Sequence, residues 1–310
     1  MERQEYQLEA VDMGNLFHQS LDQCFEVIHE NGMDCSNITE PALTIDFDVT
    51  SAYLSDLKFI GSGTLVELTG NNNQVANGAV TFEDMTLTST SGTNAALSVG
   101  SGTNLSVTDL AIAASGIALQ NNANSLTVSG ALNISTAESS NNFIGIKNQS
   151  NGLTFKSDAV VTITTASNSK VNGDFTGLDT NVEVTMEDGA SLTVTNSAGA
   201  SVSGTFTGVN YSSNSDLSVI NSDVTISNKG EAGKFTALAA DGKLTMNGDL
   251  TISSAGTVNE LFQGVSFAGD AFTMNGALSI GNTGKAGAFT GVSLANTGDG
   301  VMTFNTPLSI

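Results

Sequence analysis

The most constraining feature of the sequence is a strand pattern that recurs about every 30 residues through most of the chain. Each unit contains an apolar–Thr/Ser–apolar triplet, a short polar turn that is often Asn-Gly, and a second alternating triplet, as in residues 244–252 and 272–280. Alternation of apolar residues with Thr and Ser is typical of half-buried β-strands. Units of this length that vary mainly in their turns favour a stacked repeat architecture.

A phenylalanine falls between the strand pairs of each unit, and successive copies are 31, 29, 27 and 27 residues apart. One large ring per unit fits a narrow interior that is otherwise filled by Val, Ile, Leu and Ala. In a stack of units, side chains at the same repeat position lie above one another. The sequence therefore predicts one interior column of rings: Phe206, Phe235, Phe262 and Phe289.

The repeat predicts an all-β fold, a parallel β-solenoid (β-helix) over residues 41–310, preceded by a short helical segment. One unit forms one rung, and a single rung cannot bury its own inward face. Stacking the rungs about 4.8 Å apart gives each strand hydrogen-bonding neighbours and makes the apolar interior continuous. Asn-Gly between alternating triplets is also a hairpin signal, so an array of antiparallel sandwiches is the alternative architecture.

Rare residues divide the chain at Glu40/Pro41, because both histidines, both cysteines and the single arginine precede this point. The shift in composition predicts two domains, residues 1–40 and residues 41–310. In the first domain, Asp12 is a plausible helix N-cap and Asn31-Gly32 a plausible end. Apolar residues recur between them at helical spacing: Leu16, Phe17, Leu21, Cys24, Phe25 and Ile28.

The charge balance limits the classes of partner. The formal net charge is -22, with Lys+Arg 9 against Asp+Glu 31, which disfavours binding of the repeats to nucleic acid or anionic lipid. No run approaches the roughly 18 apolar residues of a membrane helix, so we expect no membrane span. The opening residues lead into no apolar segment of a signal peptide, which leaves the localisation open.

Residues 41–310 resemble the passenger regions of bacterial autotransporters and related adhesin-like β-helical surface proteins. They share irregular repeats rich in Ser, Thr, Asn and Gly, an acidic balance and a lack of cysteine. Ile60-Gly61-Ser62-Gly63-Thr64-Leu65 is similar to the recurrent I-x-G-x-G-T-L phrase of those rods. The resemblance implies a non-enzymatic rod at the cell surface or secreted, which binds a protein or glycan ligand along its polar strand faces or turns.

The first forty residues resemble the entry to the nuclease domain in the B subunit of AddAB-type helicase–nucleases, a RecB-like family of the PD-(D/E)XK class. The segment Gly14-Asn15-Leu16-Phe17-His18 matches the G-x-L-x-H helix of that family, which implies that His18 corresponds to its active-site histidine. The alternative function is therefore a truncated or fused B subunit of an ATP-dependent helicase/deoxyribonuclease of DNA double-strand-break repair, lacking its catalytic residues. A junction between two genes would explain the same sequence.

A nuclease of this class needs carboxylates for Mg²⁺ and a lysine for developing charge. The candidates are Asp46, Asp48 and the D-x-K-like pair Asp56 and Lys58. They follow His18 too closely for the family, and one arginine offers little grip on DNA. We therefore expect no DNA cleavage.

Other candidate sites have simpler interpretations. Cys24 and Cys35 lack the spacing of a metal pair, and His29 lacks a motif. A polysaccharide-cleaving β-helix would need clustered carboxylates, and the candidates share no demonstrable repeat position. We therefore expect no enzymatic activity, no cofactor and no bound metal. The carboxylate candidates are Asp84, Asp109, Glu187 and Asp188.

Overall fold

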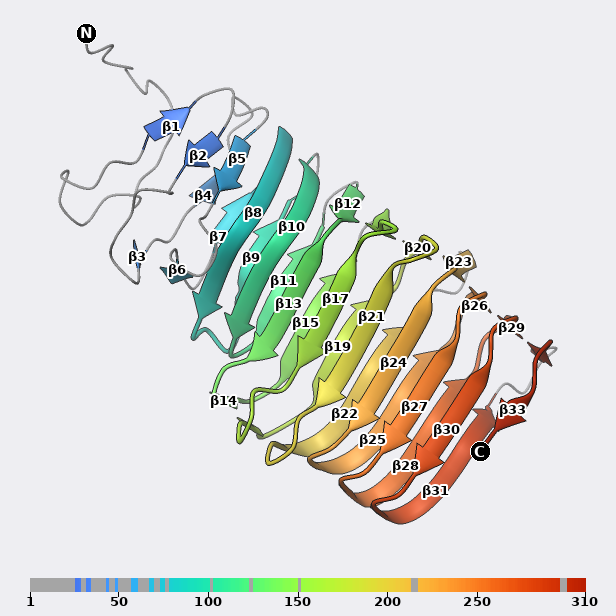
Figure 1. The fold of residues 1–310 in the computed structure, drawn as a ribbon. Coiled ribbons are helices and arrows are strands. Elements are labelled where there is room, and N and C mark those ends of the chain that lie inside the picture. The colour runs from blue at the N-terminus through green and yellow to red at the C-terminus, as the bar shows by residue number, and fades with distance from the viewer. Residues whose placement is uncertain are drawn as a thin grey trace, which may run out of the picture.

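The computed structural model describes residues 78–100, 103–122, 125–149, 152–212, 217–295 and 300–310, with short strands nearer the N-terminus (Figure 1). It is a parallel β-solenoid of about 7 turns, with no helix in the part of the chain that is described. The predicted fold class is confirmed. Among the described strands, only β1 and β2 pair antiparallel, so the alternative sandwich array is wrong.

Each full rung consists of three strand segments. The first and second segments lie in a 21-stranded sheet and are separated by a short bend, and the third lies in a 12-stranded sheet. The first segments are β12 (Ser125–Val128), β16 (Leu153–Phe155), β20 (Val184–Met186), β23 (Leu217–Ile220), β26 (Lys243–Met246), β29 (Ala271–Met274) and β32 (Val301–Phe304).

The second segments make up most of the sheet surface that faces the viewer in Figure 1. They are β13 (Ala131–Thr136), β17 (Val160–Thr164), β21 (Ser191–Asn196), β24 (Asp223–Asn228), β27 (Leu250–Ser254), β30 (Leu278–Asn282) and β33 (Leu308–Ser309). In two rungs the first and second segments form one long strand, namely β8 (Gly78–Ser89) and β10 (Thr103–Ala114).

The third segments form the opposing sheet. They are β9 (Ala95–Val99), β11 (Ile117–Asn121), β15 (Phe143–Asn148), β19 (Phe175–Thr180), β22 (Ser201–Tyr211), β25 (Glu231–Ala240), β28 (Thr257–Phe267) and β31 (Lys285–Leu294). Two short strands, β14 (Ser139–Ser140) and β18 (Lys170–Val171), pair beside them. The early strands are β1 (Glu26–Ile28), β2 (Gly32–Asp34), β3 (Leu43–Thr44), β4 (Asp48–Val49), β5 (Leu57–Ile60), β6 (Glu67–Thr69) and β7 (Asn73–Val75).

Part of the predicted helix is wrong. Residues 26–28 form β1, which pairs with β2, although Ile28 belongs to the apolar stripe of the predicted helix. The β-branched side chains of Val27 and Ile28 favour the extended backbone, which explains the strand. The rest of the predicted helix lies outside the described residues, as do Glu40 and Pro41, and the domain boundary there stays a prediction.

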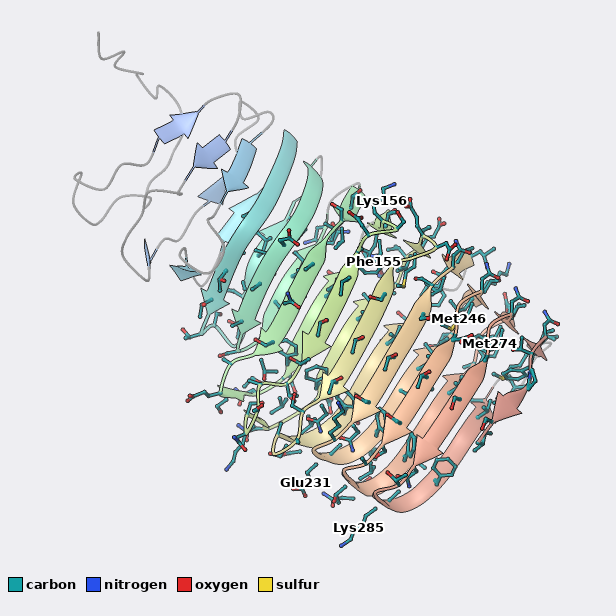
Figure 2. All side chains as sticks on the ribbon, viewed as in Figure 1. Phe155, Lys156, Glu231, Met246, Met274 and Lys285 are labelled. Atoms are coloured by element: carbon teal, nitrogen blue, oxygen red, sulfur yellow. The ribbon has the colours of Figure 1, made fainter. Side chains whose placement is uncertain are left out.

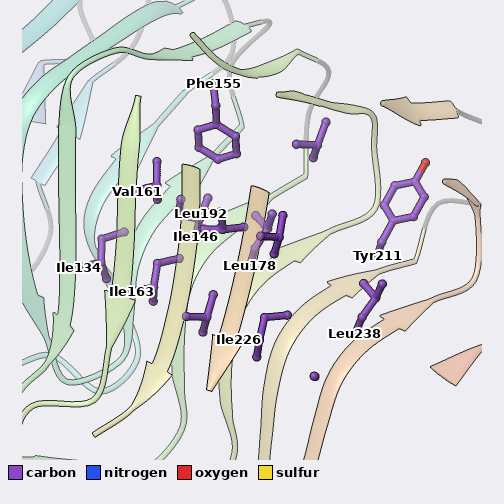
Figure 3. Close-up of a cluster of buried hydrophobic side chains, with 14 of the residues drawn as sticks. Ile134, Ile146, Phe155, Val161, Ile163, Leu178, Leu192, Tyr211, Ile226 and Leu238 are labelled. Carbon is purple, nitrogen blue, oxygen red and sulfur yellow. The ribbon is translucent and has the colours of Figure 1, made fainter. Parts of the chain in front are cut away.

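The core lies between the two sheets and repeats from rung to rung. Figure 3 shows the second-segment side chains Ile134, Ile163 and Ile226 on one side of this interior and the third-segment side chains Leu178 and Leu238 on the other. All five are buried. The alternation of Leu, Val or Ile with Thr or Ser places one set inside and the other on the surface, in agreement with the period-two pattern of the sequence.

The predicted phenylalanine column is confirmed. The rings from Phe143 to Phe289 stack through six successive rungs, with neighbouring centroids between 4.8 and 5.2 Å apart. Phe175, Phe206, Phe235 and Phe262 are fully buried, whereas Phe289 in the last strand of the column is 43% exposed. The column lets each ring contact a ring of the rung before and a ring of the rung after.

A small residue follows each phenylalanine two positions later, and Gly177 shows why. A Cβ atom on Gly177 would lie 2.5 Å from the carbonyl oxygen of Gly208 and 2.6 Å from Cγ1 of Val194. The third segment therefore approaches the second segment of the opposing sheet more closely than most side chains allow. Alanine takes this position in one rung, at Ala237.

Candidate functional site

Two rows of outward side chains on the second segments form the most regular surface of the rod, which we call the threonine face. The registers of the paired strands align each row across seven successive rungs. The first row is Thr86, Ala111, Asn133, Thr162, Thr193, Thr225 and Thr251. The second row is Thr88, Ala113, Ser135, Thr164, Thr195, Ser227 and Ser253.

The geometry of this face follows from the sheet. Positions i and i+2 of one strand are about 6.6 Å apart, and equivalent positions of adjacent strands about 4.8 Å apart. The arrows from β13 to β27 lie side by side in Figure 1, and their side chains project from them in Figure 2. The buried Ile and Val residues between the rows fix the direction of each outward side chain.

None of these positions from β8 to β27 is charged, although the chain carries a net charge of -22. The register continues the first row to Glu67 of β6, which pairs with Thr86, so the uncharged part of the row begins at β8. Three carboxylates at the bend before the second segment or at its first residue each accept a backbone N–H. Asp109 Oδ1 accepts from Ala131 at 2.8 Å, Asp223 Oδ1 from Asp249 at 2.9 Å, and Asp249 Oδ1 from Ala277 at 2.7 Å. The face itself therefore presents hydroxyls, methyls and one amide.

Most polar groups of the threonine face are unpaired within the described protein. The hydroxyls of Thr195 and Ser227 lie 2.9 Å apart and hydrogen-bond to each other. The side chains of Asn133, Ser135, Thr162 and Thr164 make no hydrogen bond to any described residue. Because these groups are partly or fully exposed, they are available to a ligand.

The threonine face is hollowed above β10. At Ala111 and Ala113 on β10, alanines interrupt both rows, and a hollow of about 250 Å³ opens above them. Its walls come from Thr86 on one side and from β13 and β17 on the other, through Asn133, Ser135, Thr162 and Thr164. Sequence reasoning missed the hollow; the available signal was Ala-x-Ala where the repeat usually has Thr-x-Thr.

The predicted carboxylates lie at the bend rather than on the face. Asp84 on β8 is opposite Asp109 on β10, because the register pairs the residues on either side of them. Glu187 and Asp188 lie at the same bend three rungs further along, roughly 14 Å from Asp109 at 4.8 Å per rung. That separation exceeds the roughly 5–10 Å of a glycosidase carboxylate pair. The candidates therefore form two separate pairs at the bends, Asp84 with Asp109 and Glu187 with Asp188.

Glu187 has a local structural contact. Its Oε1 atom accepts a hydrogen bond from Lys156 Nζ at 2.8 Å, and its Oε2 atom accepts one from the backbone N–H of Ser157 at 3.1 Å. The hydrogen bond from Lys156, more than any other contact, lowers the pKa of Glu187 below its ordinary value. This carboxylate therefore links two rungs at the bend. Asp188 next to it is exposed.

The residues of the nuclease resemblance are not assembled by the described structure. His18, Cys24, His29, Cys35, Asp46 and Asp56 lie outside the described residues. Asp48 begins β4 in the 12-stranded sheet, whereas Lys58 lies in β5 of the 21-stranded sheet. The described backbone therefore assigns these two candidates to different sheets, and the role of His18 stays a prediction.

The interior contains one further candidate, an apolar cavity of about 40 Å³ near Tyr211. Its lining is almost entirely aliphatic and includes Leu192, Ile226 and Leu250. A cavity of this size has room for little more than a water molecule, and apolar walls disfavour water. We therefore treat it as a packing gap of the core.

The described residues include no group of three or more His, Cys, Asp or Glu side chains placed to hold a metal ion. They also include no helix that is long and apolar enough to cross a membrane. No family model matches the chain, and no curated protein or solved structure gives a significant match. Function is therefore inferred from the residues of this chain alone.

Proposed function

We propose that the chain is a non-enzymatic binding rod of the cell-surface or secreted type, and that the threonine face is its binding surface. One observation carries this proposal: a strongly acidic chain has no charged residue on two rows that are aligned across seven rungs, from β8 to β27. Charged side chains on the exterior would serve solubility, so an uncharged, hydroxyl-rich face favours contact with another surface. The resemblance to adhesin-like β-helical proteins supports the same role.

The solenoid suits this role because it repeats the same surface along its length. Each added rung adds two more outward positions at a fixed spacing, so many weak contacts act together on one ligand. A ligand of this face is an uncharged surface or polymer, because an anion is repelled by the net charge and a cation finds no carboxylate on the rows from β8 to β27. An adhesin that recognises glycan or protein surfaces fits these conditions.

The test is to place charges on the face and measure binding to arrays of glycans and of extracellular-matrix proteins. We expect the full chain to bind at least one ligand, and T193K/T225K to weaken that binding about tenfold or more, because lysines would be desolvated at the contact. The control T154K/T185K places lysines at outward positions of the first segments and should bind as the parent does. Equal binding by the parent and T193K/T225K would contradict the proposal.

The alternative function, a truncated helicase–nuclease B subunit, depends on residues 2–18, which lie outside the described residues. Its test is cleavage of linear duplex DNA with Mg²⁺ by the full chain. We expect no cleavage, and activity that disappears in H18A would support the alternative.

A further inference from the structure

We infer that the hollow at Ala111 and Ala113 is a subsite for one residue of a neutral polysaccharide. This inference rests on the proposed function and names the ligand class of the threonine face. The hollow of about 250 Å³ is the place where the rows of hydroxyls are interrupted and a ligand group can enter below the level of the surrounding side chains. Its volume is just below the usual lower limit of ligand pockets, about 300 Å³, and suits a small cyclic unit.

The lining selects a polyhydroxylated, uncharged ligand. Its polar side chains are hydroxyls and one amide, from Thr86, Asn133, Ser135, Thr162 and Thr164, and the described lining residues include no acid or base. Hydroxyls both donate and accept hydrogen bonds, and the amide of Asn133 also does both, which matches the hydroxyl groups of a sugar. A charged ligand would leave its charge unpaired in this hollow.

An apolar ligand fits the lining poorly. Ile112 and Ile134 belong to the lining, but their side chains are 1% exposed and point into the core, so they contribute backbone to the hollow. The apolar surface is left to the methyl groups of Ala111 and Ala113 and of the threonines. These methyls form a small apolar floor on which the C–H face of a sugar ring can pack.

A peptide partner is also disfavoured. Extended peptides usually bind a sheet by adding a strand at an unpaired edge. The hollow lies on the face of the sheet, where β10 already pairs with β8 on one side and with β13 on the other. The backbone groups there are used within the sheet, so only side-chain groups remain to recognise a ligand.

The surroundings suit a polymer more than a free monosaccharide. Beyond Thr162 and Thr164 the rows continue over three more rungs, about 4.8 Å apart, with further hydroxyls on β21, β24 and β27. A sugar held in the hollow therefore has more hydroxyl groups beside it for the next units of the same chain. We expect affinity to rise with the number of sugar units.

The experiment compares the parent with A111T/A113T, which fills the hollow with the residues that β8 has at these positions, Thr86 and Thr88. Threonine suits an outward strand position, so the variant should remain folded, as circular dichroism would verify. The probes are the neutral cellotetraose, mannotetraose and galactotetraose, with acidic tetragalacturonate as the charged comparison, measured by calorimetry and saturation-transfer NMR. We expect at least one neutral probe to bind, tetragalacturonate not to bind, and A111T/A113T to weaken binding about tenfold or more.

Two further variants locate the site. N133A removes the one amide of the lining and should also weaken binding, which keeps the test decisive if A111T/A113T does not fold. T225A/S227A changes two positions of the threonine face outside the hollow and should affect a tetrasaccharide less than A111T/A113T does. Binding that is equal in the parent, A111T/A113T and N133A would overturn the subsite.

The outcomes separate this inference from the proposed function. If a neutral sugar binds and T193K/T225K abolishes binding while A111T/A113T does not, the threonine face stands and the hollow is wrong. If only a protein of the matrix array binds the face, the binding rod stands and the glycan assignment is wrong. If tetragalacturonate binds better than the neutral probes, the argument from charge fails and the subsite is overturned. If nothing binds the parent, both proposals fail.

Discussion

Two asparagine ladders run along the rod, one buried and one at the surface. In the buried ladder, the Asn196 Nδ2 group donates to Asn228 Oδ1 at 2.7 Å, and both side chains are fully buried. At the surface, Asn247 donates to Asn221 at 2.6 Å and Asn275 to Asn247 at 2.7 Å. The bond lengths are alike, but water can replace only the exposed bonds. Burial, more than geometry, should therefore decide what each ladder contributes to stability.

The largest loss of stability is expected when the buried phenylalanine column is interrupted, and the losses for the two asparagine ladders should be smaller. Phe235→Ala removes a fully buried ring that stacks on Phe206 and Phe262. Neighbouring rungs cannot close the gap, and we expect a loss of about 3–5 kcal/mol in the free energy of unfolding. Hydrogen exchange should rise within about one repeat on each side. Uniform exchange along the described rungs would contradict a rung-by-rung solenoid.

A break in the buried asparagine ladder should cause the second largest loss of stability. Asn228→Ala removes an acceptor of Asn196 and the donor to Ser254, both buried away from water. Asn196 keeps its hydrogen bond to the carbonyl oxygen of Glu231. We expect unfolding in denaturant to show a loss of about 1–3 kcal/mol. A loss as small as that of the exposed ladder would show that water reaches this column.

A break in the exposed asparagine ladder should cause a smaller loss of stability than a break in the buried one. Asn247→Ala breaks two side-chain bonds at the bend, to Asn221 and from Asn275. Water can take their place, so the expected loss is below about 1 kcal/mol in the same denaturant experiment. A loss equal to that of Asn228→Ala would mean that the bend is ordered by its asparagines and not by the strands on either side.

The smallest change in stability is expected for the ion pair between Lys156 and Glu187. Lys156 lowers the pKa of Glu187, so ionised Glu187 favours the folded state. Because the pKa of Glu187 is lower in the folded state, the ion pair contributes to stability above the ordinary pKa of 4.5. This contribution is lost as the pH falls through the pKa of the folded state. The pair is solvent-exposed, so the change in stability should be slight. In Lys156→Met, an NMR titration should show the pKa of Glu187 moving up towards 4.5; an unchanged pKa would contradict the pairing.

The sequence predicted those features that occur once in every unit. Phe235 and its equivalents recur at a fixed place, so the spacing alone was enough to predict their column. The hollow was not predicted in this way, because its signal, Ala111 and Ala113, occurs in a single rung and no spacing repeats it. The shared location of the carboxylate candidates at the bends was also missed, because the bend between Thr108 and Leu110 has one residue while later bends are longer, which shifts the spacing.

The parallel register also has an evolutionary consequence. A chain whose neighbouring rungs pair residue with equivalent residue can grow by duplication of one unit, because the new copy finds matching partners on both sides. Such growth adds a ring to the interior column and two positions to the outer rows while the cross-section stays constant. Length, and with it the number of places where a ligand can attach, can therefore change by unequal recombination between repeats without a new fold having to arise.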